Sequence, residues 1–365
     1  MVKNESYSGG KLREQMLQGD PFARLLGRYR IGPWKLAAVA FLLGLLYVIV
    51  LPYLFNRLPQ AMRDWPTLVI VLVAFPILMA YYLWEPESIQ TLFHAFQAQI
   101  SGQGKAKKKS ELPFSDLYAH PLWFWIAVLL GLLQSVYIYY DTMYHRSGWQ
   151  SAHPLMPAVL IPMRFMSFYA LVFIIARHIL TIRVINRFLD MYPVDVLVLP
   201  LGRPSGLYVL APFALSTGVI IGVVGLILGM TVLNIFNGVE RFTVEFLIEL
   251  ALYAIAAPVL FLLPLWKAHR LMREAKNGLL DELEMKTQEQ YAASLANLRN
   301  GTLRASDADR LEALEELYEL TRKIPTWPLN FQTVSRFGVA VTLPVIIPLL
   351  LDVFTNMVAS WLLAF

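Results

Sequence analysis

The feature that most constrains this chain is a series of apolar segments, most of them about 20 residues long or longer. A helix of that length crosses the roughly 30 Å of hydrocarbon in a bilayer. Charged residues make up only 16% of the 365 residues, whereas a soluble domain carries about 25%. The sequence therefore predicts an all-α, polytopic membrane protein.

We expect about seven transmembrane helices, because the apolar segments are separated by polar loops that reverse the chain. Their expected bounds are 34–55, 65–84, 121–140, 155–182, 208–236, 242–266 and 338–365. The predicted division is an N-terminal segment at 1–33, helices one to six at 34–266, a helical hairpin at 267–328, and a re-entry segment with helix seven at 329–365.

Positive charge alternates between the loops. Lys and Arg gather in segments 1–33, 85–119, 183–207 and 267–336. Cytoplasmic loops carry such an excess. We therefore expect a multi-pass protein of the cell membrane with a cytoplasmic N-terminus and an extracytoplasmic C-terminus. We expect no cleavable signal, because the first apolar run begins too late.

Two short segments are typical of helices that lie on the membrane surface. Asp20 can cap a helix with Pro21 at its first position, and residues 22–29 then place apolar side chains at spacings of three and four. The segment 89–96 predicts a second interfacial helix.

The basic linker at 101–110 carries Lys107, Lys108 and Lys109, for which we expect anionic lipid headgroups as the partner. Basic residues are not interleaved with exposed aromatics elsewhere, so the pattern does not favour nucleic acid. The chain has no cysteine, which excludes disulfides and thiolate chemistry.

The segment 267–328 predicts a cytoplasmic antiparallel hairpin. Its first arm is rich in good helix formers, Asn300-Gly301 is a turn signal, and Ser306 with Asp309 resembles a capping box that opens the second arm. Two interpretations stay open. The hairpin is a solvated connection, or its apolar stripe packs as a coiled coil on copies of the chain or on a cytoplasmic protein partner.

Charges inside membrane helices are costly and often functional. Four are expected in the outer half of the bilayer: Arg164, Glu245, Glu249 and Asp352. We predict that Arg164 pairs with Glu249 or Asp352, because their depths are similar. This network is either an ion pair that fixes the packing or the lining of a polar cavity or ion path.

Small residues in the fifth predicted helix indicate close helix packing, since they recur at spacings of four. They are Gly218, Gly222, Gly225 and Gly229. In the sixth predicted helix, Pro258 and Pro264 predict bends.

The sequence offers no catalytic motif, so we do not expect an enzyme. No histidine pair has ligand spacing, and we expect neither a metal nor another cofactor. Two function classes remain. The first is an oligomeric ion channel, or channel-like transport pore, built from copies of this chain. The second is a non-transporting scaffold or signalling subunit whose hairpin binds a partner.

Overall fold

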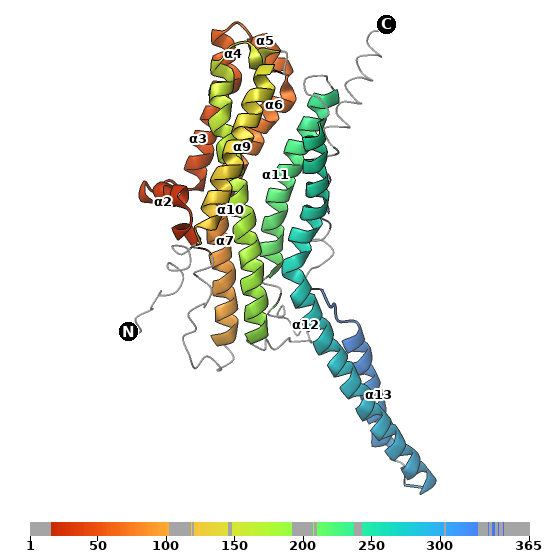
Figure 1. Ribbon diagram of the computed structural model, residues 1–365. Helices are drawn as coiled ribbons and strands as arrows, with labels where there is room; N and C mark the ends of the chain where they lie inside the picture. Colours follow the sequence, from red (N-terminus) through yellow and green to blue (C-terminus); the bar gives the residue numbers. More distant parts are fainter. Residues whose placement is uncertain are drawn as a thin grey trace, which may run out of the picture.

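The computed structural model describes residues 16–101, 118, 120–144, 148–191, 207, 210–236, 243–302, 304–327 and the single positions 335, 338, 339, 342 and 346. Within these residues the secondary structure is helical and contains no strand. The helices form a long bundle from which one helical pair projects (Figure 1). Six of them are long and apolar enough to cross a membrane, as expected of a polytopic membrane protein.

The first two membrane-crossing segments are each interrupted by a π turn. One consists of α3 (Pro33–Leu45), η1 (Leu46–Val50) and α4 (Leu51–Leu54), and the other of α6 (Trp65–Val69), η2 (Ile70–Ala74) and α7 (Phe75–Ser101). The remaining four are α9 (Leu122–Tyr144), α10 (Leu155–Met191), α11 (Leu210–Phe236) and α12 (Val244–Arg299). These six fall on the first six predicted spans, whereas the predicted seventh span lies almost wholly outside the described residues.

Each π turn ends just before a proline, Pro52 after η1 and Pro76 after η2. A proline ring clashes with the carbonyl four residues earlier, and the wider turn accommodates it. The two segments also lie very close together. A Cβ added to Gly44 would lie 2.9 Å from the carbonyl oxygen of Val71. Glycine at this position therefore allows α3 to contact the backbone of η2.

Two helices extend further than the sequence suggested. The prediction of a separate interfacial helix at 89–96 is wrong, because α7 continues through Pro86 to Ser101. Ile89 and Phe93 are buried, so this apolar face packs inside the bundle instead of on lipid. Similarly, α10 continues beyond 182, and its Asp190 forms an ion pair with Lys267 of α12.

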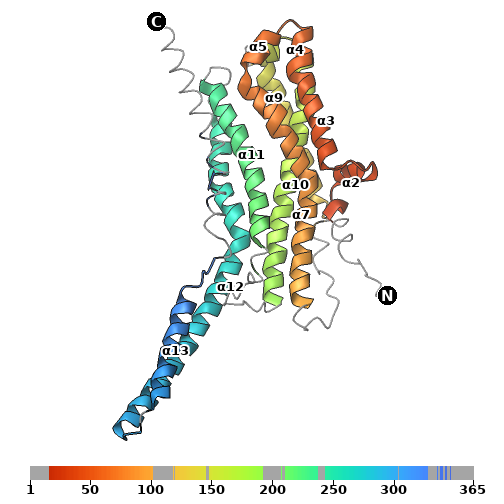
Figure 2. The same ribbon diagram turned by 180° about the vertical axis from the view of Figure 1, so that it is seen from behind.

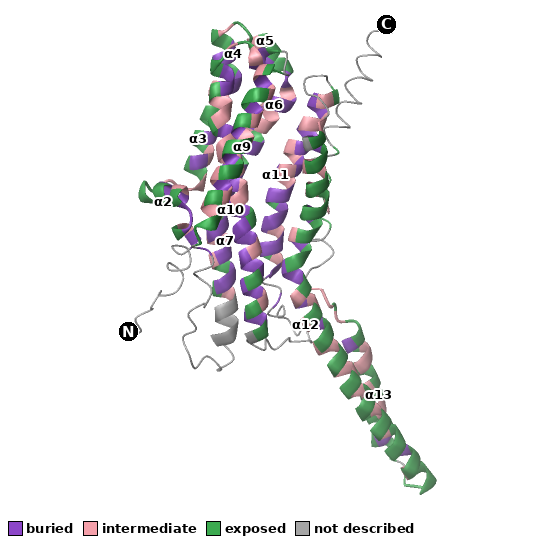
Figure 3. Ribbon diagram, viewed as in Figure 1, coloured by how far each residue is buried: buried purple, intermediate pink, exposed green. Residues whose placement is uncertain are grey.

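The projecting pair consists of the second half of α12 and α13 (Ala305–Arg322). The two helices pack side by side and extend away from the bundle (Figures 1 and 2). Lys276 of α12 donates to the carbonyl oxygens of Arg322 at 2.6 Å and Ile324 at 2.9 Å, which fixes the end of α13. The pair is mostly exposed, in contrast to the buried faces of the bundle (Figure 3).

The predicted capping box at the start of α13 is wrong by two residues. The Arg304 backbone N–H donates to the Asp307 carboxylate at 3.3 Å, so the box closes before Ser306. A further bond from the Asn297 amide to Asp307, also 3.3 Å, explains the shift. It ties the box to the preceding helix, a contact that local spacing does not reveal.

Candidate functional site

A cavity of about 330 Å³ lies between α10, α11 and α12. Each helix contributes one face, with lining residues at spacings of three and four positions. The main lining residues are 164, 167, 168, 171, 174, 175 and 178 of α10, 217, 220, 221, 224, 227 and 228 of α11, and 249, 252, 253, 256, 257 and 260 of α12. Most of them are apolar. We call this cavity the apolar chamber.

A second cavity of about 130 Å³ adjoins the first. Its lining is about half polar, and the polar part includes Tyr47, Thr67, Tyr137, Asp141, Gln150, Thr231 and Thr243. Ile70, Arg164, Ile227 and Glu249 line both cavities. We call the second cavity the polar chamber. The two chambers therefore share walls, and charged side chains of both signs lie at their junction.

Of the four predicted membrane charges, the structure brings two together. Arg164 and Glu249 line the same two chambers, and the Arg164 guanidinium lies 5.2 Å from the centre of the Phe168 ring. The predicted pairing of Arg164 with Glu249 stays a prediction. The Glu245 side chain and Asp352 lie outside the described residues, as do Lys107, Lys108 and Lys109.

The predicted packing glycines lie on α11. Gly218, Gly225 and Gly229 are buried and Gly222 is half-buried. This burial fits close packing of α11 against its neighbours, and their specific role stays a prediction.

His178 lies at one end of the α10 lining of the apolar chamber. Its Nε2 atom lies 3.0 Å from the carbonyl oxygen of Leu260. The imidazole also stacks on Phe213, with 4.9 Å between ring centres. On the side, the lining residue Leu252 is 61% exposed. The chamber therefore opens at the surface of the described helices on this side.

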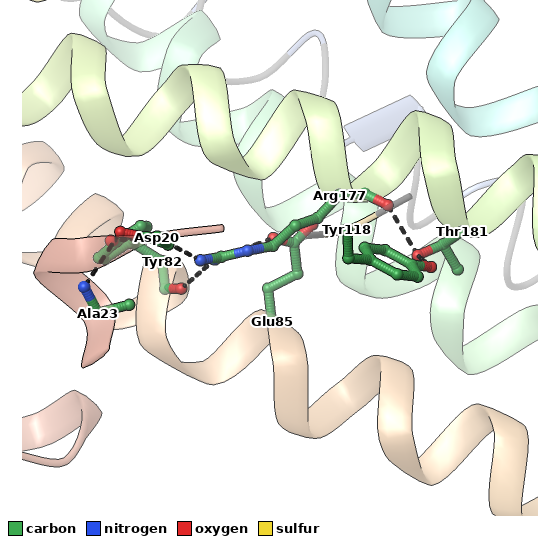
Figure 4. Close-up of polar contacts among 7 residues, drawn as sticks. All are labelled: Asp20, Ala23, Tyr82, Glu85, Tyr118, Arg177 and Thr181. Carbon is green, nitrogen blue, oxygen red and sulfur yellow. Dashed lines mark hydrogen bonds and ion pairs between the residues drawn. The ribbon is translucent and has the colours of Figure 1, made fainter. Parts of the chain in front are cut away.

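A buried ionic cluster lies next to His178, and the predictions from the sequence did not include it. Arg177 directly precedes His178 in α10 and is itself buried. Its guanidinium lies 2.6 Å from an Asp20 carboxylate oxygen and 3.8 Å from Glu85, and it donates to the Tyr82 carbonyl at 2.9 Å (Figure 4). The cluster joins three chain segments far apart in sequence.

Asp20 is the centre of this cluster and is completely buried. It caps α2 (Pro21–Arg28) by accepting from the Ala23 N–H at 3.1 Å, which confirms the predicted cap. It also accepts from the hydroxyls of Tyr82 and Tyr169. The Asp20 carboxylate therefore accepts from one ionic donor and three neutral donors, and charge-assisted bonds of this kind are stronger than neutral ones.

One signal for this cluster was present in the sequence. Arg177 lies inside the predicted fourth span, 155–182, and an arginine within a membrane helix needs a partner. No sequence pattern identified Asp20 as that partner, because its spacing indicated only a helix cap. One turn after Arg177 on α10, the hydroxyl of Thr181 lies 3.0 Å from the hydroxyl of Tyr118 (Figure 4). Burial raises the pKa of the Tyr118 phenol well above its ordinary value.

A second buried carboxylate organises the far end of the bundle. Asp64 caps α6 through the Thr67 N–H at 3.2 Å and accepts from Trp149 Nε1 and Gln150 Nε2, each at 3.0 Å. The Asn234 amide reaches the Thr67 hydroxyl at 3.4 Å. Thr67 and Gln150 line the polar chamber, so this network holds its wall in place.

Comparison of the chain with models of known families, with curated proteins and with solved structures gave no match. Among the residues that the structure describes, no group of three or more His, Asp or Glu side chains could hold a metal ion. We therefore argue the function from the residues that line the two chambers.

Proposed function

We propose that this multi-pass membrane protein binds a single-chain amphiphile, with the chain in the apolar chamber and the head in the polar chamber. The observation that carries this proposal is the junction, where Arg164 and Glu249 line both compartments. A mostly apolar cavity with a few convergent polar groups is the usual form of a small-molecule site. The proposal assigns the chain a binding role and no catalytic step.

The dimensions of the apolar chamber support a long, narrow occupant. Its volume of about 330 Å³ lies at the small end of the range for ligand pockets, roughly 300–1,000 Å³. On α10 the lining extends from Arg164 to His178, about 20 Å along the helix axis. The side opening at Leu252 offers entry directly from the bilayer.

The charges of the polar chamber favour a zwitterionic head. Arg164 offers a guanidinium to an acidic group such as a phosphate, whereas Asp141 and Glu249 offer carboxylates to an ammonium group. A head with charges of both signs could satisfy both kinds of side chain. A head with charge of one sign would meet repulsion from one of them.

The test uses two tryptophan substitutions that lie two positions apart on α12. Ala256 and Ala254 are both exposed, but only Ala256 is among the lining residues of the apolar chamber. The probe is a lysophosphatidylcholine with a fluorophore at the end of its acyl chain, titrated into purified protein. Ala256→Trp should weaken saturable binding by at least about tenfold, which is a cost of ~1.4 kcal/mol, and Ala254→Trp should leave it unchanged. Equal affinities in all three proteins would refute the proposal.

An oligomeric ion channel is the second candidate, and the polar chamber with Arg164, Glu249 and Asp141 favours it. The adjoining apolar chamber opposes conduction through a single subunit, because apolar constrictions lose water. Ion flux into proteoliposomes distinguishes the candidates. A channel requires flux in the wild type and changed flux after Arg164→Leu, whereas an amphiphile-binding protein shows no flux in either.

A scaffold or signalling role rests on the projecting pair. Met285, Tyr291, Leu298 and Leu317 are exposed on α12 and α13, and such a surface suits a second copy of the chain or a cytoplasmic partner. This role is compatible with ligand binding, because α12 both lines the chamber and projects from the bundle. We propose that the pair is cytoplasmic, since segment 267–336 is rich in Lys and Arg. Cross-linking in cells would report the oligomeric state.

A further inference from the structure

The short helix α2 is attached to the bundle through its N-terminal cap and its buried face. Its cap Asp20 bonds to Arg177, Tyr82 and Tyr169 inside the bundle. Ala23 and Leu26 of α2 are also buried. Contacts with the bundle therefore hold α2 in place.

The outward face of α2 and the start of α3 is cationic. Arg24, Arg28, Arg30 and Lys35 are all exposed, and residues 21–35 include no Asp or Glu. The neighbouring carboxylate, Asp20, is buried against Arg177 and does not neutralise this face.

The same surface carries large exposed apolar side chains. Trp34 is 84% exposed, Tyr29 is 68% exposed and Leu25 is 49% exposed. The first membrane-crossing segment begins at Pro33, and α2 stands out sideways beside that point (Figure 1). Tryptophan and tyrosine are enriched at membrane interfaces because one end of each ring system is apolar and the other is polar. These observations favour a lipid surface over an acidic protein.

We propose that α2 and the first turn of α3 form a docking surface for the headgroups of anionic lipids. Leu25, Tyr29 and Trp34 enter the interface, while the cations reach the phosphates. One guanidinium group can donate two parallel hydrogen bonds to the oxygens of a phosphate. The positive charge of this surface favours a lipid with net negative charge over a zwitterionic lipid. This surface is separate from the two chambers, so the inference stands independently of the proposed function.

The test measures lipid selectivity with spin-labelled lipids in reconstituted membranes. The immobilised fractions of labelled phosphatidylglycerol and labelled phosphatidylcholine give a relative association constant. One variant carries glutamine at Arg24, Arg28, Arg30 and Lys35. The control variant carries glutamine at four exposed cations of the projecting pair: Arg273, Arg299, Arg310 and Lys323. Both variants lose the same charge, and neither changes a residue of the buried cluster.

In low salt the wild type and the control should prefer phosphatidylglycerol by about threefold or more, because each exposed cation near an anionic surface adds to the attraction. The α2 variant should lose most of that preference, and 1 M salt should remove it from all three, because screening then acts within about 3 Å. No preference in the wild type, or an equal loss in both variants, would overturn the proposal. A preference that persists in 1 M salt would do the same.

Discussion

Replacing Asp20 by asparagine should reveal how strongly the buried ionic cluster holds the bundle together. Asparagine has nearly the shape of aspartate, and its amide oxygen can still cap α2 through the Ala23 N–H. The change removes the negative charge that lies 2.6 Å from the Arg177 guanidinium. Arg177 would keep Glu85 at 3.8 Å as a weaker ionic partner.

The expected cost follows from these contacts. Removing one member of a buried ion pair destabilises a protein by roughly 3–5 kcal/mol. Because Glu85 remains, we expect the lower end of that range, about 3 kcal/mol, for Asp20→Asn. Asp20→Ala should cost about 2 kcal/mol more, since it also removes the cap and leaves the Tyr82 and Tyr169 hydroxyls without their acceptor.

The assay is a double-mutant cycle on unfolding in mixed micelles. It compares Asp20→Asn, Arg177→Met and the double variant, with hydrogen exchange of residues 20–31 as a local readout. Neutral replacement of both partners can be nearly neutral for stability, so the double variant should recover about 2 kcal/mol relative to the sum of the single changes. A coupling energy below about 0.5 kcal/mol would show that the pair does not stabilise the bundle.

Two further predictions concern packing and surface charge. Gly44→Ala should destabilise the protein by about 1–3 kcal/mol in the same assay, because its Cβ would lie 2.9 Å from the Val71 carbonyl oxygen. Gly278→Ala, in open space on α12, should instead stabilise that helix, and a loss of stability in both would contradict this reasoning. The hydrogen bond from Lys286 lowers the pKa of Glu282 below its ordinary value. The Glu282–Lys286 pair therefore contributes to helix stability at pH values above the ordinary pKa of a glutamate. That contribution is lost as the pH falls through the lowered pKa of Glu282. Carboxyl NMR of Lys286→Met should show the pKa of Glu282 returning upward, and an unchanged pKa would refute the pairing.

The membrane-crossing architecture was predictable because it depends on local composition. Apolar length located the first six spans, and the spacing of Asp20 and Pro21 located the start of α2. Both signals lie within one turn or one segment of the chain. The lengths of α7 and α10 were underestimated, since their C-terminal ends are stabilised by packing and ionic contacts with other helices.

The candidate site was only partly predictable for the same physical reason. Arg164 and Glu249 could be found as charges in apolar segments, and both line the two chambers. The chambers themselves arise from three helix faces, and no single segment encodes their apposition. Asp20 and Arg177 are 157 positions apart, so only the tertiary structure reveals their contact.

The location of a bound amphiphile tests the central claim most directly. Purified protein would be labelled with a lysophosphatidylcholine that carries a photoreactive diazirine on its acyl chain, and the labelled peptides would be mapped by mass spectrometry. We predict labelling of the apolar chamber, at residues such as Phe168, Val224 and Leu252, and loss of that labelling with excess unlabelled lipid. Labelling confined to exposed residues of α9, such as Leu129 and Val136, and insensitive to competitor, would contradict the account.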